Sequence, residues 1–303
     1  MNPISRREFV TLTAAGVLAA PGVFHSRSAY AQASLTAQQI VDRIRQRAGV
    51  EWKTATVDAF KAGDPATAVK GIATTAMATM DVLKEAVKAG ANLVITCEPT
   101  FYSRADSPSP GGARRGGPAG PDAVFTAKNE FIERNGLVVW RFSDHWRLRT
   151  PDPLSVGLAD ALGWARFRAA DDPRLITAPV IALDSLASDI KQKLNIGGGI
   201  RIVGDPRSRI QKIGLLPGTT AIQAALSLFP KVDAIVGGEV REWESVELAR
   251  DKVTAGENKS LILIGRVVSE NPGMNAAAQW LKTVVPELPT TWIPVTDPYW
   301  RPA

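Results

Sequence analysis

The apolar residues of this chain form two similar series of strand-like and helix-like segments. Each series begins with a short apolar run, continues with apolar positions at helical spacing, and ends with a second apolar run. The segments are 69–74, 76–88 and 93–96 in the first series and 211–216, 219–228 and 232–236 in the second. This order predicts two βαβ units, and therefore an α/β fold of two similar lobes with mainly parallel strands.

Acidic residues follow the predicted strands in both series. Cys97 and Glu98 come directly after the first series, Glu239 follows the second, and Glu270 follows a further apolar strand. Pro99 has no backbone N–H to donate, so the strand before Cys97 ends there. Since open α/β sheets bind ligands beyond the carboxyl ends of their strands, these acids are expected to share one site.

The rest of the pattern fills in the two lobes. It predicts helices at 124–134, 154–162 and 276–283 and strands at 137–142, 200–203 and 261–265. Lobe one is expected over about 34–165, a connecting segment over 166–199 and lobe two over about 200–303. The Gly/Pro-rich segment 107–121 is expected to be a plain surface insertion or a lid. The turn at 195–199 is no phosphate loop, because no Gly-Lys-Ser/Thr follows it.

The first 33 residues have the features of a bacterial export signal. Arg6 and Arg7 precede an apolar stretch at 10–23, and Ala29-Tyr30-Ala31 is a small-x-small cleavage motif, with Ala31-Gln32-Ala33 as a second option. Twin arginines are typical of the route that exports folded proteins. The apolar stretch is shorter than the roughly 20 residues that a spanning helix needs. The sequence predicts a twin-arginine signal peptide at 1–33, the export machinery as a partner, a periplasmic or extracellular location, and no stable membrane insertion after cleavage.

Net charge and the counts of cysteine and histidine bear on three features: nucleic-acid binding, disulfide bonds and histidine-rich metal sites. A net charge of +6 over 303 residues, without a basic cluster, gives no reason to expect nucleic-acid binding. Cys97 is the only cysteine, so no internal disulfide forms. Of the two histidines, His25 lies in the predicted signal and only His145 lies outside it. A site that needs several imidazole ligands cannot be built from this composition.

Several short motifs occur in an order that resembles one protein family. They are Gly63-Asp64-Pro65, Cys97-Glu98-Pro99, Gly238-Glu239, Glu242-Trp243-Glu244, Gly265-Arg266, Ser269-Glu270 and Pro272-Gly273-Met274. Together they resemble the Nif-three (NGG-one-interacting factor three) family, also described as dinuclear-metal-centre hexameric and type 2 GTP cyclohydrolase I-like proteins. The resemblance implies two α/β lobes, self-association into a toroidal hexamer, and an interlobe site where divalent metals activate a water for hydrolysis.

The resemblance also implies that most of the family's metal ligands are replaced in this chain. Cys97 and Glu98 stand where the family has its first histidines, and Arg147 falls at the middle ligand. Arg266 replaces the histidine of the terminal His-x-x-x-Glu pair, of which Glu270 is kept. What remains is a reduced metal set of Cys97, Glu98 and Glu270, accompanied by two fixed positive charges that oppose metal binding.

Two interpretations of this site require no metal. In the first, Arg147 and Arg266 pair with Glu98 and Glu270, and the protein is non-catalytic or repurposed. In the second, Arg147 and Arg266 bind an anion, because guanidinium groups match phosphate and carboxylate geometry.

A third interpretation is a metal-dependent hydrolase with a single altered site. Cys97, Glu98 and Glu270, with Asp144 or His145, would hold one Zn, Mn or Fe ion. A nucleophilic Cys97 would need His145 as its base. The alternatives are that Cys97 is a small buried residue at a strand end and that His145 is a hydrogen-bonded loop residue.

Overall fold

The structure is a computed structural model that describes residues 34–103, 106 and 123–300. The predicted signal peptide at 1–33 and the Gly/Pro-rich segment 107–121 lie outside the described residues. Ser34–Ala303 forms one compact unit. Among the described helices, none combines the length and the apolar character that a membrane crossing requires.

The first sheet has five strands, of which four run parallel. Its order is β1 (Phe60–Ala62), β4 (Val138–Arg141), β3 (Leu93–Thr96), β2 (Ile72–Thr75) and β10 (Thr290–Trp292). Only the short edge strand β1 is antiparallel to its neighbour. The central strands β2, β3 and β4 are buried at every position, as expected for a parallel sheet covered on both faces.

The second sheet repeats this plan. Its order is β5 (Leu175–Ala182), β7 (Arg209–Thr219), β8 (Ala234–Glu239), β9 (Ser260–Leu263) and β6 (Arg201–Val203). The three central strands are parallel, and the two edge strands are antiparallel to them. Successive residues of β8 pack into cores on opposite faces, with Val236 in one core and Ile235 in the other. The predicted α/β fold of two similar, mainly parallel lobes is confirmed.

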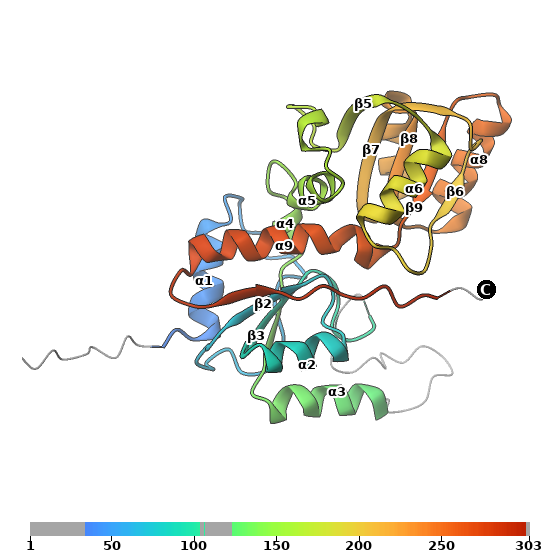
Figure 1. The fold of residues 1–303 in the computed structure, drawn as a ribbon. Helices are drawn as coiled ribbons and strands as arrows, with labels where there is room; N and C mark the ends of the chain where they lie inside the picture. Colours follow the sequence, from blue (N-terminus) through green and yellow to red (C-terminus); the bar gives the residue numbers. More distant parts are fainter. Residues whose placement is uncertain (1–33, 104–105, 107–122, 301–303) are drawn as a thin grey trace, which may run out of the picture. The chain divides into compact units, whose positions relative to one another are not determined.

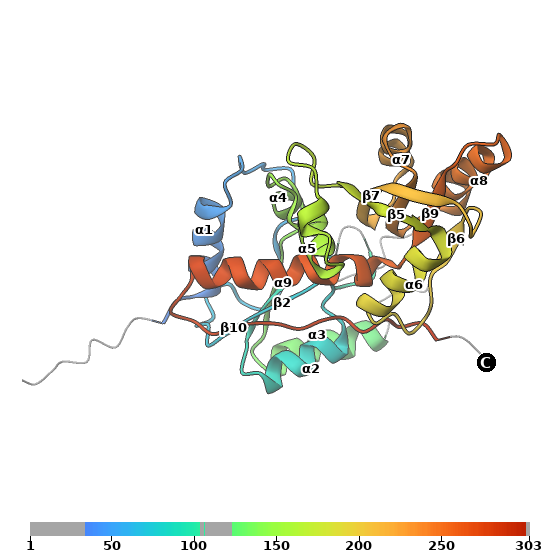
Figure 2. The ribbon, with the colours of Figure 1, turned by 45° about the horizontal axis from the view of Figure 1, so that its top comes forward.

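Helices cover both sheets, and one of them contacts strands of both. The helices are α1 (Ala37–Arg47), α2 (Met80–Lys88), α3 (Ala123–Arg134), α4 (Asp144–Arg147), α5 (Pro153–Ala161), α6 (Leu183–Lys193), α7 (Ile222–Leu228), α8 (Glu247–Thr254) and α9 (Arg266–Val284). Figures 1 and 2 show α2 and α3 on one face of the first sheet and α9 on the other. Since α9 contacts β2, β7 and β8, it joins the two lobes.

Three predicted helices differ from the structure by more than one residue at one end. The helix expected at 76–88 begins only at Met80, because the Thr79 hydroxyl caps it by accepting from the backbone N–H of Val82. The helix expected at 219–228 begins at Ile222, because β7 continues through Thr219.

The largest difference concerns α9, expected only at 276–283. It starts at Arg266 and continues through Pro272, which removes a hydrogen bond at a cost of about 3 kcal/mol. Tight packing offsets this cost, because Gly273 lies against Gly157 of α5 with no room for a Cβ on either residue. Glu270 therefore lies on a helix and not on a strand-end loop.

The boundaries expected for the lobes also need correction. The segment 166–199 was expected to be a connection, but it contributes β5 and α6 to the second lobe. The C-terminal part of lobe two returns to the first sheet, where Thr290–Trp292 pairs with Ile72–Thr74. Short edge strands such as β10 carry too few residues for their pattern to reveal their partner.

Candidate functional site

The first side of the site is the end of β3. The backbone N–H of Cys97 donates to the Thr75 carbonyl (3.2 Å), and that of Glu98 donates to the Ala76 carbonyl (2.8 Å). Both residues therefore extend the backbone hydrogen bonding beyond the end of β3. The Thr96 hydroxyl donates to the Glu98 carbonyl (3.0 Å) and fixes the turn. Both side chains are buried, with Cys97 at 0% and Glu98 at 5% exposure. The strand end therefore presents an acid inward, as the sequence predicts.

Asp58, which sequence analysis did not single out, positions the second side of the site. Its carboxylate accepts from the backbone N–H groups of Ser143 (2.6 Å), Asp144 (2.9 Å) and His145 (2.9 Å). It thus caps α4 from a distant part of the chain and neutralises the helix start. Because α4 is a single turn, this cap determines where Arg147, at its last position, points. No sequence spacing links residues this far apart.

His145 is a structural residue in this arrangement. Its Nε2 accepts from the backbone N–H of Lys53 (2.8 Å), so Nδ1 carries the proton and donates to Asp58 (2.7 Å). The ring is fully buried and stacks on Trp52 at 3.7 Å between centroids. With both nitrogens engaged, His145 is neither a metal ligand nor a base for Cys97. Asp144 is likewise engaged by Thr56.

Arg147 lies among the three residues expected to form the reduced metal set. Its Nη2 contacts Glu98 Oε1 at 3.3 Å, Cys97 Sγ at 3.7 Å and Glu270 Oε1 at shorter range. Burial disfavours the charged guanidinium, but the neighbouring Cys97, Glu270 and Glu98 outweigh it and raise the pKa of Arg147 above its usual value. The group is therefore a permanent cation.

Arg266 completes the arrangement from the first position of α9. Its Nη1 lies 2.5 Å from Glu98 Oε2 and 4.0 Å from Glu270 Oε1, and its Nη2 lies 2.8 Å from Glu239 Oε1. Nη2 also donates to the Thr219 hydroxyl. We call Arg147, Arg266, Glu98, Glu239 and Glu270 the Arg–Glu cluster. The acids Glu98, Glu239 and Glu270 therefore lie together around the two guanidinium groups.

Two glycines, Gly218 and Gly238, allow the Arg–Glu cluster to form. At Gly218, with φ of +83°, a Cβ would lie 2.4 Å from Glu270 Oε1 and 3.0 Å from Arg147 Nη2. The backbone N–H of Gly218 donates to the Ser269 hydroxyl (2.9 Å), which ties the end of β7 to α9. At Gly238 a Cβ would lie 2.1 Å from the Gly218 carbonyl. Only glycine fits at either position.

Burial raises the pKa of two acidic groups at the site. Burial, followed by the neighbouring Glu98 carboxylate, raises the pKa of Glu270 to about 8, although Arg147 and Arg266 act to lower it. Glu270 Oε2 is buried and has no hydrogen-bond partner among the described residues. Burial also raises the pKa of the Cys97 thiol to about 12.

The donor set itself can hold a metal only in competition with the arginines. Ligand atoms of Cys97, Glu98 and Glu270 lie within 4.8 Å of one another, close enough to share one ion. Zinc prefers four ligands, and these residues supply three, one of them a thiol disfavoured as thiolate. The Arg147 guanidinium contacts all three groups, so it takes the place that a cation would need.

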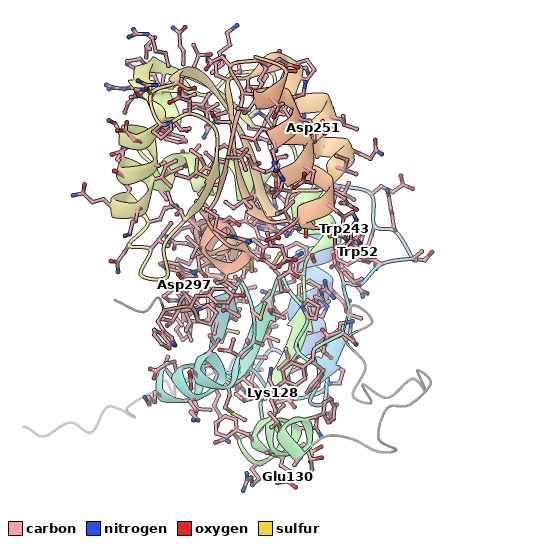
Figure 3. The ribbon with its side chains drawn as sticks, turned by 90° about the vertical axis from the view of Figure 1, so that its right-hand side faces the viewer. Trp52, Lys128, Glu130, Trp243, Asp251 and Asp297 are labelled. Atoms are coloured by element: carbon pink, nitrogen blue, oxygen red, sulfur yellow. The ribbon has the colours of Figure 1, made fainter. Side chains whose placement is uncertain are left out.

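Residues 242–244 lie outside the Arg–Glu cluster. They belong to a π-helical turn, Glu242–Val246, in which Trp243 is 74% exposed (Figure 3). Glu242 pairs with Arg201 (2.6 Å), and Glu244 pairs with Arg241 (2.9 Å). These pairs are exposed and contribute little to stability.

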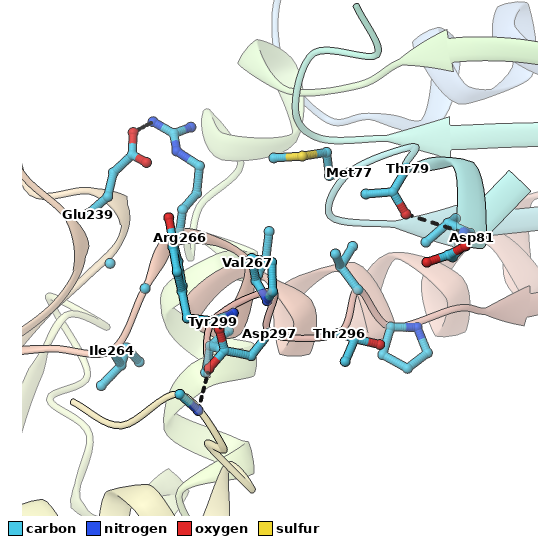
Figure 4. A pocket seen from close by; sticks show the side chains of 18 of the residues that line it. Met77, Thr79, Asp81, Glu239, Ile264, Arg266, Val267, Thr296, Asp297 and Tyr299 are labelled. Atoms are coloured by element: carbon cyan, nitrogen blue, oxygen red, sulfur yellow. Dashed lines mark hydrogen bonds and ion pairs between the residues drawn. The ribbon is translucent and has the colours of Figure 1, made fainter. Parts of the chain in front are cut away.

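Two cavities adjoin the Arg–Glu cluster. The larger, about 960 Å³, is lined by Arg266 and Glu239, by Met77 to Glu85 around α2, and by the C-terminal segment 293–300 (Figure 4). The smaller, about 350 Å³, is lined by Lys53, Thr56 and Arg147 among others. The larger cavity has the size of a small-molecule site.

Known proteins resemble this chain in part of its sequence and in most of its fold. Residues 158–298 match the family model described as Duf34/NIF3 (NGG1p interacting factor 3). No curated protein sequence matches the chain. The crystal structure of Staphylococcus aureus hypothetical protein SA1388 is similar, with a TM-score of 0.67 at 14% identity over 88% of this chain and 99% of that one.

Two further structures show the same fold. A Bacillus cereus protein related to NIF3 has a TM-score of 0.65 at 12% identity, covering 89% of this chain and 100% of that one. Protein ybgI, of unknown function, has a TM-score of 0.65 at 20% identity, covering 87% and 100%. At these identities the structural similarity establishes the fold alone, and the chemistry of the site depends on the residues of this chain.

Proposed function

The chain belongs to the Duf34/NIF3 family, and we propose that it is a metal-independent, non-hydrolytic member of it. In this proposal the Arg–Glu cluster replaces the metal centre and joins the lobes around a ligand-binding cavity. The observation that carries the proposal is the position of Arg147, whose guanidinium contacts Cys97, Glu98 and Glu270 together. A fixed cation there satisfies the acids and excludes a second cation.

The same geometry disfavours the anion-binding interpretation. Each guanidinium is already engaged by at least two carboxylates, and Arg266 also donates to Thr219. An incoming phosphate or carboxylate would have to displace these partners and to approach Glu98, Glu239 and Glu270. Like charges at this range oppose such binding.

A substitution experiment on the full chain tests the proposal. We expect the wild type to bind Zn²⁺ weakly in calorimetric titrations, and the Arg147→Ala/Arg266→His double variant to bind it more tightly by at least one order of magnitude. The matched control is Arg241→Ala/Arg250→Ala, which removes two exposed arginines outside the cluster. If the double variant binds Zn²⁺ no better than the wild type and the control, then the arginines do not take the place of a metal.

The alternative function is a metal-dependent hydrolase with one altered metal site. It is favoured by the closeness of the Cys97, Glu98 and Glu270 ligand atoms and by the unpartnered Glu270 Oε2, a group that a metal would satisfy. In that case Arg147 would have to move when Zn, Mn or Fe binds. Metal-dependent hydrolysis of phosphoester probes, lost in Glu270→Gln and unaffected by Glu242→Gln, would support this function.

We also propose that the protein is exported and self-associates. Export rests on Arg6, Arg7 and the apolar stretch at 10–23, and self-association rests on family membership. A fusion of residues 1–40 to a reporter should reach the periplasm, and Arg6→Lys/Arg7→Lys should retain it in the cytoplasm. Light scattering after size exclusion measures the assembly, and a strictly monomeric mass would refute self-association.

A further inference from the structure

The cavity beside the Arg–Glu cluster has one wall made of the C-terminal segment 293–300. After β10, this segment leaves the first sheet and runs beside α9 toward the second lobe (Figure 2). Val295 is fixed by the Asn271 side chain, which donates to its carbonyl (2.8 Å) and accepts from its N–H (3.0 Å). The segment is thus held in one position along the cavity.

A second attachment places a carboxylate in this wall. Asp297 Oδ2 accepts from the backbone N–H of Gly198 (3.0 Å), and Oδ1 accepts from that of Tyr299 (3.1 Å). A Cβ at Gly198 would lie 2.6 Å from Asp297 Oδ2 and 2.8 Å from the Tyr299 carbonyl, so only glycine permits this approach. The glycine-rich turn at 195–199 therefore serves as the docking point of the C-terminal segment.

The charges that line the cavity are predominantly negative. Its charged residues are Asp81, Glu85, Glu239, Asp297, Arg201 and Arg266. Arg201 is paired with Glu242 and Arg266 with Glu98 and Glu239, while Asp81 is paired with Lys84 and Glu85 with Lys88. Asp297 has no cationic partner among the described residues, and each of its oxygens keeps a free lone pair.

Aromatic and apolar surfaces flank this carboxylate. Tyr299 and Trp300 line the cavity and are 73% and 79% exposed, so their ring faces remain open to a ligand. Figure 4 shows Tyr299, Val267 and Asp297 among the lining side chains, with the Arg266–Glu239 ion pair also drawn. A carboxylate next to aromatic faces is the arrangement that recognises ammonium groups in proteins.

We propose that this cavity binds an organic ammonium ion with an apolar body. The ammonium group would lie between Asp297 and the Tyr299 and Trp300 rings, and the apolar body would lie along Met77, Val267 and Val295. This inference rests on the proposed function and names the ligand class of its cavity. It requires that Arg266 stays paired with Glu98 and Glu239.

Calorimetry on the full chain in the presence of a chelator tests the inference. The probe is benzyltrimethylammonium, compared with its uncharged carbon analogue neopentylbenzene and with benzoate. We expect the ammonium probe to bind at least about tenfold more tightly than either comparison compound, a difference of about 1.4 kcal/mol. Asp297→Asn, which removes the charge and keeps an acceptor for Gly198 but not for Tyr299, should weaken it roughly tenfold, as should Trp300→Leu.

Matched substitutions outside the cavity serve as controls. Asp251→Asn on α8 and Trp243→Leu should leave the affinity unchanged (Figure 3). Equal binding of neopentylbenzene, preferred binding of benzoate, or full affinity in Asp297→Asn would each overturn the inference. Because the chelator removes metals, this result is independent of the metal titration, so either proposal can fail without the other.

Discussion

Arg266 Nη1 lies 2.5 Å from Glu98 Oε2, and this ion pair connects the first residue of α9 to the end of β3. The contact joins an element that packs on both sheets to a strand end of the first sheet. With Arg147 on the other side of Glu98, it creates a charge network where the family resemblance places metals. The predictions below follow from this network and from the packing that surrounds it.

Removing Arg147 should destabilise the fold. Arg147→Met keeps most of the side-chain volume and leaves Glu98 and Glu270 without their shared cation, which should lower the free energy of unfolding by about 3 kcal/mol. Chemical denaturation measures this loss. The control Arg250→Met removes an exposed partner of Glu247 and should cost less than about 1 kcal/mol. Equal losses of unfolding free energy in the two variants would show that the ion pairs of Arg147 stabilise the fold no more than an exposed ion pair does.

A methyl group at Gly218 should disrupt the Arg–Glu cluster. Gly218→Ala combines a φ of +83° with a Cβ only 2.4 Å from Glu270 Oε1, so we expect a loss above about 2 kcal/mol. Gly256 is a matched control, since its φ is +84° and a Cβ at this position would meet no atom within 4 Å. Gly256→Ala should cost only the backbone strain, about 1 kcal/mol. The melting temperatures of the two variants separate the two costs, because Gly256→Ala reports backbone strain alone and Gly218→Ala reports strain plus the steric clash.

Lys128 on α3 should make stability depend on pH. Its side chain is buried, its Nζ donates to the Thr100 carbonyl (2.6 Å), and burial lowers its pKa from 10.5 to about 8 (Figure 3). Between these two values the unfolded chain binds more protons, so stability from this residue rises with pH. Below about pH 8 the charged amine imposes its full burial penalty.

The comparison of wild type with Lys128→Met isolates this effect. The wild type should gain stability relative to the variant as pH rises from 7 to 10.5, since only the wild type releases a proton from this site. Lys84→Met, at an exposed lysine of α2, should show no such trend. A stability difference between wild type and Lys128→Met that stays constant with pH would contradict the lowered pKa.

Cys97 should be unreactive in the folded protein. Its side chain is fully buried, and a rise in pKa from 9.0 to about 12 reduces the thiolate fraction roughly a thousandfold. A thiol-specific disulfide reagent should therefore label the native chain slowly and the denatured chain completely. Fast stoichiometric labelling of the native protein at neutral pH would restore the interpretation of Cys97 as a nucleophile.

The sequence predicted the central buried strands and the acids that follow them. Buried strands such as Leu93–Thr96 have an unmistakable apolar pattern, and the turn at Pro99 fixes where Glu98 emerges. Glu98 and Glu270 come together because both lobes direct their strand ends and helix starts to one side. In the structure Arg147 and Arg266 form ion pairs with these acids, and the role of the site stays a prediction.

Other parts of the site depend on contacts that leave no periodic pattern. Asp58 caps α4 across 85 residues, and Gly218 matters only because another chain segment approaches it. The sequence leaves the role of His145 open, because a single histidine can act as a metal ligand or can form buried hydrogen bonds. The full length of α9 was missed because Pro272 normally ends a helix, and only tertiary packing outweighs its cost.

The central claim is that guanidinium groups stand in place of the family's metals. Its most direct test is elemental analysis of the full chain, expressed and then incubated with Zn²⁺, Mn²⁺ and Fe²⁺ and dialysed without chelator. We predict far less than one bound metal ion per chain, in agreement with an Arg147 side chain that contacts Cys97, Glu98 and Glu270. One or two tightly bound metal ions per chain, lost in Glu270→Gln, would contradict the account.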